Sequence, residues 1–339
     1  MTKKILIMML ERKIFGNDRT FDLIDEEYAR NSGIKEISSP KGFSAIADWK
    51  GKNFLTFLLH YGLPFLNEYC RNSEILDNFR YLLNGVYYLS MKRITDSCIE
   101  LASQEIENFL STFVEIYGEQ NIQPNVHELY HVVQSVKLCG PLWINSTFNY
   151  ERLNFDLRKC VRSSLRPDLQ MASRWSAVRN LKANAKHLKD HPKISELCDD
   201  IGVTICESIA REMPGKTKDV PPEYFEFIGR RKAVFFKRLF LNGEILESED
   251  YSIKFKKSNC YFTYQDYYAK IVAIIDVDNE KKIIYKKFDF MQISVNTVKI
   301  TGEVSLGVLE AYSLIDKCVP VIVNGFLYLT KRPNRIINE

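Results

Sequence analysis

The spacing of apolar residues changes near Pro222, and this change limits what the chain can fold into. Between residues 46 and 212, apolar residues recur every three or four positions, which is the period of an amphipathic helix. Beyond Pro222, runs rich in β-branched and aromatic residues predict strands at 233–241, 251–255, 260–264, 267–277, 282–288, 314–319 and 321–329. The sequence therefore predicts an α+β protein, with a mainly helical region followed by a small all-β barrel or sandwich.

Four segments follow from this pattern. Residues 1–45 are predicted to form an N-terminal extension that ends in a loop, and residues 46–212 to form the helical region. Residues 213–222 have the sequence MPGKTKDVPP and are predicted to be a linker, because three prolines and a glycine oppose regular structure. Residues 223–339 then make the β module.

Composition is that of a globular protein, with 45% hydrophobic and 27% charged residues. No stretch reaches the roughly 18 apolar residues that a membrane span requires, so we expect no membrane association. The apolar stretch near the start is interrupted at Glu11 and Arg12, too early for a signal peptide. The eight cysteines are scattered and form no Cys-x-x-Cys pair, which predicts reduced thiols in an intracellular protein.

Two histidines, His127 and His131, are four residues apart in a segment with helical periodicity. This spacing places both imidazoles on one face of a helix, as when a helix supplies two ligands to zinc. Cys139 is a candidate third ligand. The alternative is that the two histidines share a helix face by chance, since a structural zinc site has four ligands.

The segment that follows residue 124 combines the two histidines, a Gly-Pro break and a Trp/Phe-rich run ending in a glutamate. The residues concerned are Asn125, Val126, His127, Leu129, His131, Val136, Gly140, Pro141, Leu142, Trp143, Ser146, Phe148, Tyr150, Glu151 and Asn154. With these residues the segment resembles the C-terminal part of the catalytic domain of CACTA-type (En/Spm-like) cut-and-paste DNA transposases. A weaker similarity around Trp49 and Tyr61–Pro64 extends the resemblance to roughly residues 40–175.

That resemblance implies that the helical region is the C-terminal part of an RNase H-like domain. It implies that His127 and His131 are half of a zinc site whose other half is an upstream cysteine pair, and that Glu151 is the last acidic residue of an Asp-Asp-Glu centre. The family's two aspartates and its cysteine pair would lie before residue 1. Two-metal phosphoryl transfer needs several carboxylates around ions about 4 Å apart. We therefore expect Glu151 to be vestigial and the chain alone not to be an enzyme.

A basic stretch follows Glu151. Residues 152–190 include ten lysines or arginines and three acidic residues, a balance of +7. Arg158, Arg162 and Arg166 recur every four residues, which predicts a stripe on one helix face that ends at Pro167. Together with Lys159, this stripe is a candidate phosphate-contacting surface, and a solvated basic face is the alternative.

Three functions remain open on this sequence. The first is a transposase-derived, catalytically inactive nuclear protein that contacts DNA without reading its sequence. The second is a protein-interaction or chromatin adaptor whose β module binds a partner. The third is a subunit of an active transposase, completed by another chain that supplies the aspartates. Zinc is the one cofactor that the resemblance implies.

Overall fold

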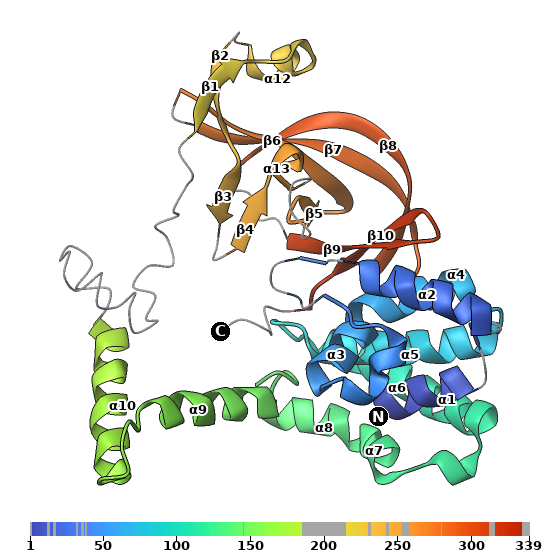
Figure 1. The fold of residues 1–339 in the computed structure, drawn as a ribbon. Coiled ribbons are helices and arrows are strands. Elements are labelled where there is room, and N and C mark those ends of the chain that lie inside the picture. Colours follow the sequence, from blue (N-terminus) through green and yellow to red (C-terminus); the bar gives the residue numbers. More distant parts are fainter. Residues whose placement is uncertain are drawn as a thin grey trace. The chain divides into compact units, whose positions relative to one another are not determined.

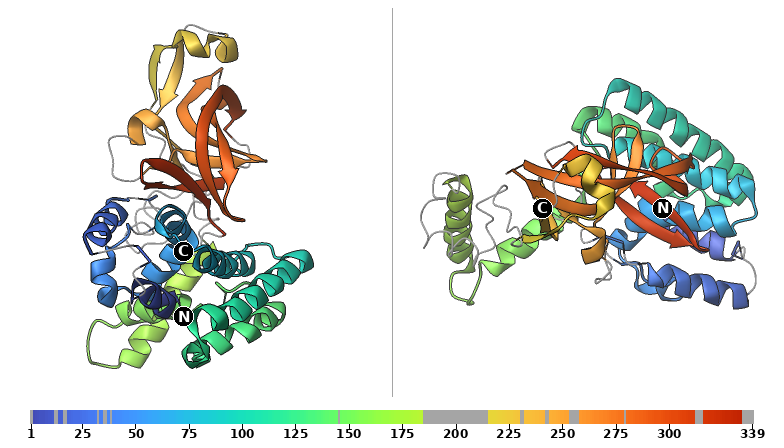
Figure 2. Two further views of the ribbon diagram at one scale, coloured as in Figure 1. Left: turned by 90° about the vertical axis from the view of Figure 1, so that its right-hand side faces the viewer. Right: turned by 90° about the horizontal axis from the view of Figure 1, so that it is seen from above.

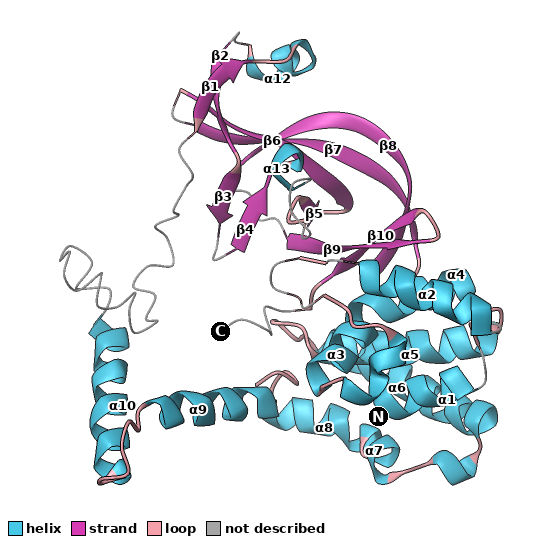
Figure 3. Ribbon diagram, viewed as in Figure 1, coloured by secondary structure: helices cyan, strands magenta, loops and turns pink. Residues whose placement is uncertain are grey.

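The fold is seen in a computed structural model of the chain (Figure 1). The structure describes residues 2–11, 14–15, 18–31, 33–34, 37, 39–144, 146–184, 215–229, 232–241, 244–252, 258–278, 280–311 and 316–333. These residues form a helical N-terminal half and a C-terminal antiparallel sheet of eight strands, so the predicted α+β class is confirmed (Figure 3).

The chain divides into two compact units, which are described separately. The first unit comprises Met1–Leu142, Glu212–Leu239 and Ile245–Glu339. The second comprises Trp143–Arg211 and Phe240–Glu244. The helical half and the eight-stranded sheet therefore belong mostly to the first unit, whereas the basic stretch belongs to the second.

The helices of the first unit begin close to the N-terminus. Asn72 and Thr95 cap two of them by accepting hydrogen bonds from Ile75 N at 3.1 Å and Cys98 N at 3.3 Å. The described helices of the N-terminal half are α1 (Thr2–Glu11), α2 (Asp18–Arg30), η1 (Phe43–Asp48), α3 (Gly51–Thr56), the π-helix η2 (Phe57–Tyr61), α4 (Gly62–Tyr69), α5 (Ser73–Leu89), α6 (Asp96–Tyr117), η3 (Glu119–Asn121), α7 (Pro124–His127) and α8 (Leu129–Cys139). Three short helices lie among the strands: η5 (Pro222–Tyr224), α12 (Phe225–Ile228) and α13 (Glu249–Ser252).

The sheet runs in the order β1-β2-β6-β5-β9-β10-β8-β7. Strand β6 also pairs with β7, so β6, β5, β9, β10, β8 and β7 close into a ring of six antiparallel strands. The strands are β1 (Lys216–Asp219), β2 (Lys232–Phe236), β5 (Tyr261–Tyr264), β6 (Tyr267–Val277), β7 (Glu280–Gln292), β8 (Thr297–Glu310), β9 (Asp316–Val323) and β10 (Phe326–Lys331), with β3 (Arg238–Leu241) and β4 (Glu244–Glu247) pairing separately.

One apolar cluster fills the interior of this ring, because its side chains come from all six strands. Its largest buried members are Tyr268 and Phe288. The remaining members are Tyr261, Phe290, Val298, Ile300, Cys318, Leu327 and Leu329. Within the stretch predicted to be a linker, residues 216–219 form the edge strand β1, and residues 213 and 214 lie outside the described part.

A second apolar core joins the helices to the sheet. Val319, Val321 and Val323 on β9 and Tyr328 on β10 are buried in the same cluster as the helical side chains. Figure 2 shows β9 and β10 beside the N-terminal helices, and Asn31 at the end of α2 exchanges hydrogen bonds with the backbone of Ile322 at 2.8 and 3.0 Å. The helical half and the sheet therefore share one core in the first unit.

Candidate functional site

The two motif histidines lie at the junction of α7 and α8. Their ring centroids are 5.4 Å apart, and the rings are inclined at 77°. Both side chains are exposed, while Val126, Leu129 and Val133 anchor the two short helices in the core. The imidazoles are therefore neighbours, as their spacing in the sequence predicts.

These neighbours do not make up a zinc site among the described residues. No group of three or more His, Cys, Asp or Glu residues is arranged to hold a metal ion in the part of the chain that the structure describes. Cys139 is exposed at the end of α8, eight residues beyond His131, and does not join the pair in such a group. A structural zinc site has four ligands, so this donor set does not fit one.

Glu151 lies in the first part of α9 (Thr147–Lys159), and its side chain is exposed. It belongs to the second compact unit, whereas His127 and His131 belong to the first. Among the described residues, Glu151 is not part of any group of carboxylates that could hold a metal ion. A single exposed carboxylate cannot position two catalytic ions.

The described basic residues that follow Glu151 lie on or near a helix–loop–helix; residues 185–190 of the basic stretch lie outside the described part. Helix α9 ends at Lys159, and α10 (Pro167–Asn184) begins after a seven-residue loop, 160–166. Gln170 on α10 holds this loop, since its Oε1 accepts from Arg162 N at 3.0 Å and its Nε2 donates to Ser163 Oγ at 2.8 Å. Arg174 Nη1 also donates to the carbonyl oxygen of Cys160 at 2.8 Å.

The predicted arginine stripe on one helix face is wrong. Arg158 lies in the last turn of α9, while Arg162 and Arg166 lie in the loop. The helix does not continue through Arg162, because Arg162 N donates to the Gln170 side chain instead of to a carbonyl one turn back. Pro167 disfavours a helical conformation at the preceding residue, Arg166. Arg166 instead has a φ of 48°.

The loop nevertheless gathers exposed cations. Arg158, Lys159 and Arg162 are exposed and have no carboxylate within ion-pair distance among the described residues. Arg166 Nη2 lies 3.3 Å from Asp168 Oδ2, and this interaction lowers the pKa of the Asp168 carboxyl. Lys159 Nζ lies 4.4 Å from the centroid of the Phe155 ring.

Exposed aromatic and aliphatic side chains accompany these cations. Phe155 is 50% exposed and Tyr150 is 58% exposed. Leu165 lies within the loop and Leu169 follows at the start of α10, and both are also exposed. A surface that combines cations with exposed rings can contact phosphates and can stack on bases.

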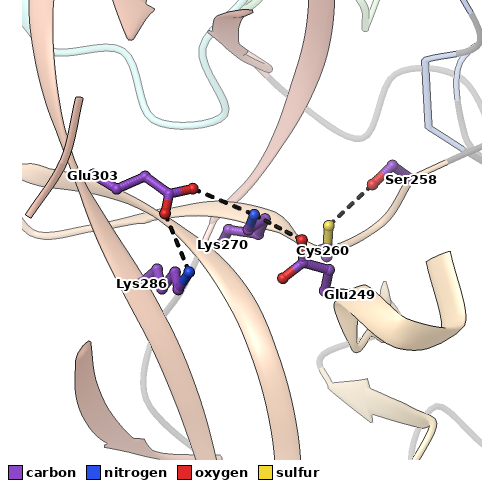
Figure 4. A network of polar contacts seen from close by, with 6 residues as sticks. All are labelled: Glu249, Ser258, Cys260, Lys270, Lys286 and Glu303. Atoms are coloured by element: carbon purple, nitrogen blue, oxygen red, sulfur yellow. Dashed lines mark hydrogen bonds and ion pairs between the residues drawn. The ribbon is translucent and has the colours of Figure 1, made fainter. Parts of the chain in front are cut away.

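A charged network joins Glu249 on α13 to strands β6, β7 and β8 (Figure 4). Lys270 Nζ on β6 is 2.8 Å from Glu249 Oε1 and 3.6 Å from Glu303 Oε1, and Lys286 Nζ is 3.1 Å from Glu303 Oε2. Burial is the largest single influence on the pKa of Lys270 and lowers it. The hydrogen bond that Lys270 donates to Glu249 and the negative charges of Glu249 and Glu303 together outweigh burial, so that the pKa is raised. Because the two cations and two carboxylates satisfy one another, we assign this network to stability.

Sequence reasoning placed no function on His60, which is buried in the π-helix η2. Its Nδ1 lies 2.9 Å from Thr330 Oγ1 on β10. Burial, with a smaller contribution from the Arg332 charge, lowers the pKa of His60 from 6.5 to about 3. The local sequence FLLHY has no polar pattern that would signal this partner, which lies 270 residues away in the chain.

Comparisons with protein-family models, with curated proteins and with solved structures find no match to this chain. Of the helices in the described ranges, none has the length and apolar character needed to cross a membrane.

Proposed function

We propose that this chain is a transposase-derived, catalytically inactive protein that binds nucleic acid through the loop between α9 and α10. The supporting observation is the set of exposed cations around that loop, three of which lack a carboxylate partner among the described residues. Unpaired cations are free to replace the counterions of a phosphate backbone. The resemblance of residues 40–175 to CACTA-type transposases supports DNA as the ligand and a nuclear location.

The structure of the loop favours contact with phosphates over base reading. Arg162 and Arg166 lie in a loop that Gln170 fixes, and Arg158 and Lys159 lie at the end of a helix. Neither helix presents all four cations on one face that could enter a groove. Phosphate contacts position a protein on a duplex but convey little sequence information, so we propose binding without strong sequence preference.

The same proposal assigns the helical region to the C-terminal part of an RNase H-like domain. Under this assignment Glu151 is the remaining acidic residue of the catalytic centre and is vestigial. Its exposed position on α9, outside any metal-holding group among the described residues, supports an inactive site. We propose no step through zinc, because the described donors near His127 do not fit it.

The test is a fluorescence-anisotropy titration of a labelled duplex across a range of salt concentrations. The wild-type protein is compared with the triple variant Arg158→Glu/Lys159→Glu/Arg162→Glu, which reverses the three cations that lack a carboxylate partner among the described residues. Each lost phosphate contact should reduce the slope of log K against log salt by about 0.9, so the variant should lose about 2.7. Its affinity at low salt should fall at least about a hundredfold.

A matched control distinguishes the effect of this surface on binding from the effect of net charge. Arg71, Lys92 and Arg93 are exposed in the first unit, and replacing all three by Glu changes the charge by the same amount. This control variant should bind the duplex with nearly the wild-type slope. If both variants lose affinity equally, net charge and not the loop explains binding. If the wild-type protein does not bind at low salt, the proposed function is wrong.

A further inference from the structure

An apolar pocket lies on the first unit, away from the basic loop in sequence. It has a volume of about 300 Å³ and lies between α6 and the segment that leads from η3 into α8. Its floor includes the buried Phe113 and Val126, while Ile122 and Tyr130 at its rim are 45% and 65% exposed. The full lining is Leu110, Phe113, Val114, Ile122, Val126, His127 and Tyr130.

The volume of this pocket suits one or two bulky apolar side chains. Side chains such as Leu or Trp from a docked helix fill pockets of this kind. The apolar residues that contact the groove then lie at positions i, i+3 or i+4, and i+7 of that helix. The large exposed fractions of Ile122 and Tyr130 leave apolar surface that such a helix would cover.

The segment of the chain that forms the pocket is acidic. From Ile94 to Val136 the chain has seven acidic residues and neither lysine nor arginine. On α6, Glu100, Glu107, Leu110 and Val114 follow the spacing of a single helix face, so exposed carboxylates continue the same stripe as two residues of the pocket lining.

The acidic groups are also available to a partner. Glu100 and Glu107 are exposed, and Glu128 is exposed immediately after the pocket residue His127. None of the three has a lysine or arginine partner among the ion pairs of the described residues, while Glu107 accepts only from Ser103 Oγ at 3.1 Å. Nucleic acid would be repelled here, whereas a cationic segment would be attracted.

We infer that this pocket is a docking site for a basic amphipathic helix of a partner protein. The bulky apolar residues of that helix would enter the pocket, and its lysines or arginines would face Glu100, Glu107 and Glu128. The site lies outside the proposed nucleic-acid surface and has the opposite charge. It therefore provides a second, protein-binding function that does not depend on DNA binding.

The test uses the full chain and a labelled peptide of about 18 residues, which spans about five helical turns. The peptide has leucines at helical spacing on one face with a central tryptophan, and lysines elsewhere. Wild-type protein should bind it, and the rim variant Ile122→Asp/Tyr130→Asp should weaken binding at least tenfold. The reversal variant Glu107→Lys/Glu128→Lys should weaken it by a similar factor and reduce its dependence on salt.

Three controls decide the outcome. Leu23→Asp on α2 alters an equally exposed apolar residue, and Glu226→Lys/Glu310→Lys alters two exposed carboxylates elsewhere, so both should bind the peptide as the wild type does. A peptide of the same composition in an order that is not amphipathic should not bind. The inference is overturned if the wild type does not bind, if the reordered peptide binds equally, or if the rim variants retain affinity. It is also overturned, in favour of a second copy of this chain, if the protein alone self-associates in sedimentation and the rim variants abolish that association.

Discussion

The Nδ1 atom of His60 lies 2.9 Å from Thr330 Oγ1, which joins the π-helix η2 to the last strand of the ring. Both residues are almost completely buried. A hydroxyl can donate to an unprotonated imidazole nitrogen, so this pair is satisfied without a charge in the core. The neutral state of His60 is consequently coupled to the packing of the helices on the sheet.

This coupling predicts acid sensitivity. The pKa of His60 is lowered from 6.5 to about 3, so below pH 6.5 the unfolded chain takes up a proton that the folded chain does not. The free energy of unfolding should therefore fall as the pH is lowered from about 6.5 to 3, by up to about 1.4 kcal/mol per pH unit. Urea denaturation of the wild type and of His60→Asn, which retains a polar group near Thr330, measures this contribution as a difference. Parallel pH profiles for the two proteins would contradict it.

Asn296 should also stabilise the packing of the helices on the sheet. It is fully buried in the turn between β7 and β8, where its Nδ2 donates to the carbonyl oxygen of Leu59 at 2.8 Å. Leu59 belongs to the π-helix. Asn296→Ala leaves this carbonyl without that donor, which should cost about 1–3 kcal/mol of unfolding free energy. Urea denaturation should show this loss, while Gln104→Ala on the exposed side of α6 should change stability by less than about 0.5 kcal/mol. A loss no larger than that of the control would show that Asn296 is dispensable.

Strand β8 is a part of the sheet that the sequence pattern does not predict. The sequence predicts no strand between 288 and 314, yet Thr297–Glu310 forms one of the longest strands. Gly302 and Gly307 weaken its local strand pattern. In the structure Gly307 lies opposite Tyr285, and a Cβ at this glycine would lie 2.5 Å from the Tyr285 ring. Gly307 therefore leaves room for the Tyr285 ring on the neighbouring strand, and a local sequence pattern cannot reveal this contact.

Other differences have local causes that the sequence contained. The run 321–329 was predicted as one strand, but Asn324 and Gly325 have φ values of 51° and 78° and form a tight turn between β9 and β10. An Asn-Gly pair between apolar runs is a strong hairpin signal. The helical half was easier to predict, because its apolar period is continuous and because N-cap residues such as Asn72 and Thr95 directly precede the helices that they cap. The conformation of loop 160–166 depends on hydrogen bonds from the Gln170 side chain, and the periodicity of apolar residues does not identify such contacts.

The loop itself should be sensitive to Gln170→Ala. The Gln170 side chain forms hydrogen bonds with Arg162 N and Ser163 Oγ. Removing this side chain should let the loop open, so that trypsin can reach the peptide bond after Arg162. Limited proteolysis should show cleavage after Arg162 several times faster than in the wild type. Gln134→Ala, at an exposed position on α8, should leave that rate unchanged. An unaltered cleavage rate in the Gln170 variant would mean that other contacts, such as Arg174 with the Cys160 carbonyl, suffice to hold the loop.

The His127–His131 pair should not hold zinc tightly. Because His127 and His131 have no third ligand among the described residues, a tightly bound zinc ion should not contribute to folding. Treatment with a chelator should leave the Tm unchanged within about 1 °C, and His127→Ala/His131→Ala should lower it by no more than about 2 °C, the effect of roughly 1 kcal/mol in a chain of this size. Elemental analysis of the purified protein provides an independent reading. Stoichiometric zinc that is lost together with a large fall in Tm would show that further ligands come from residues outside the described ranges, and would restore the zinc site that the transposase resemblance implies.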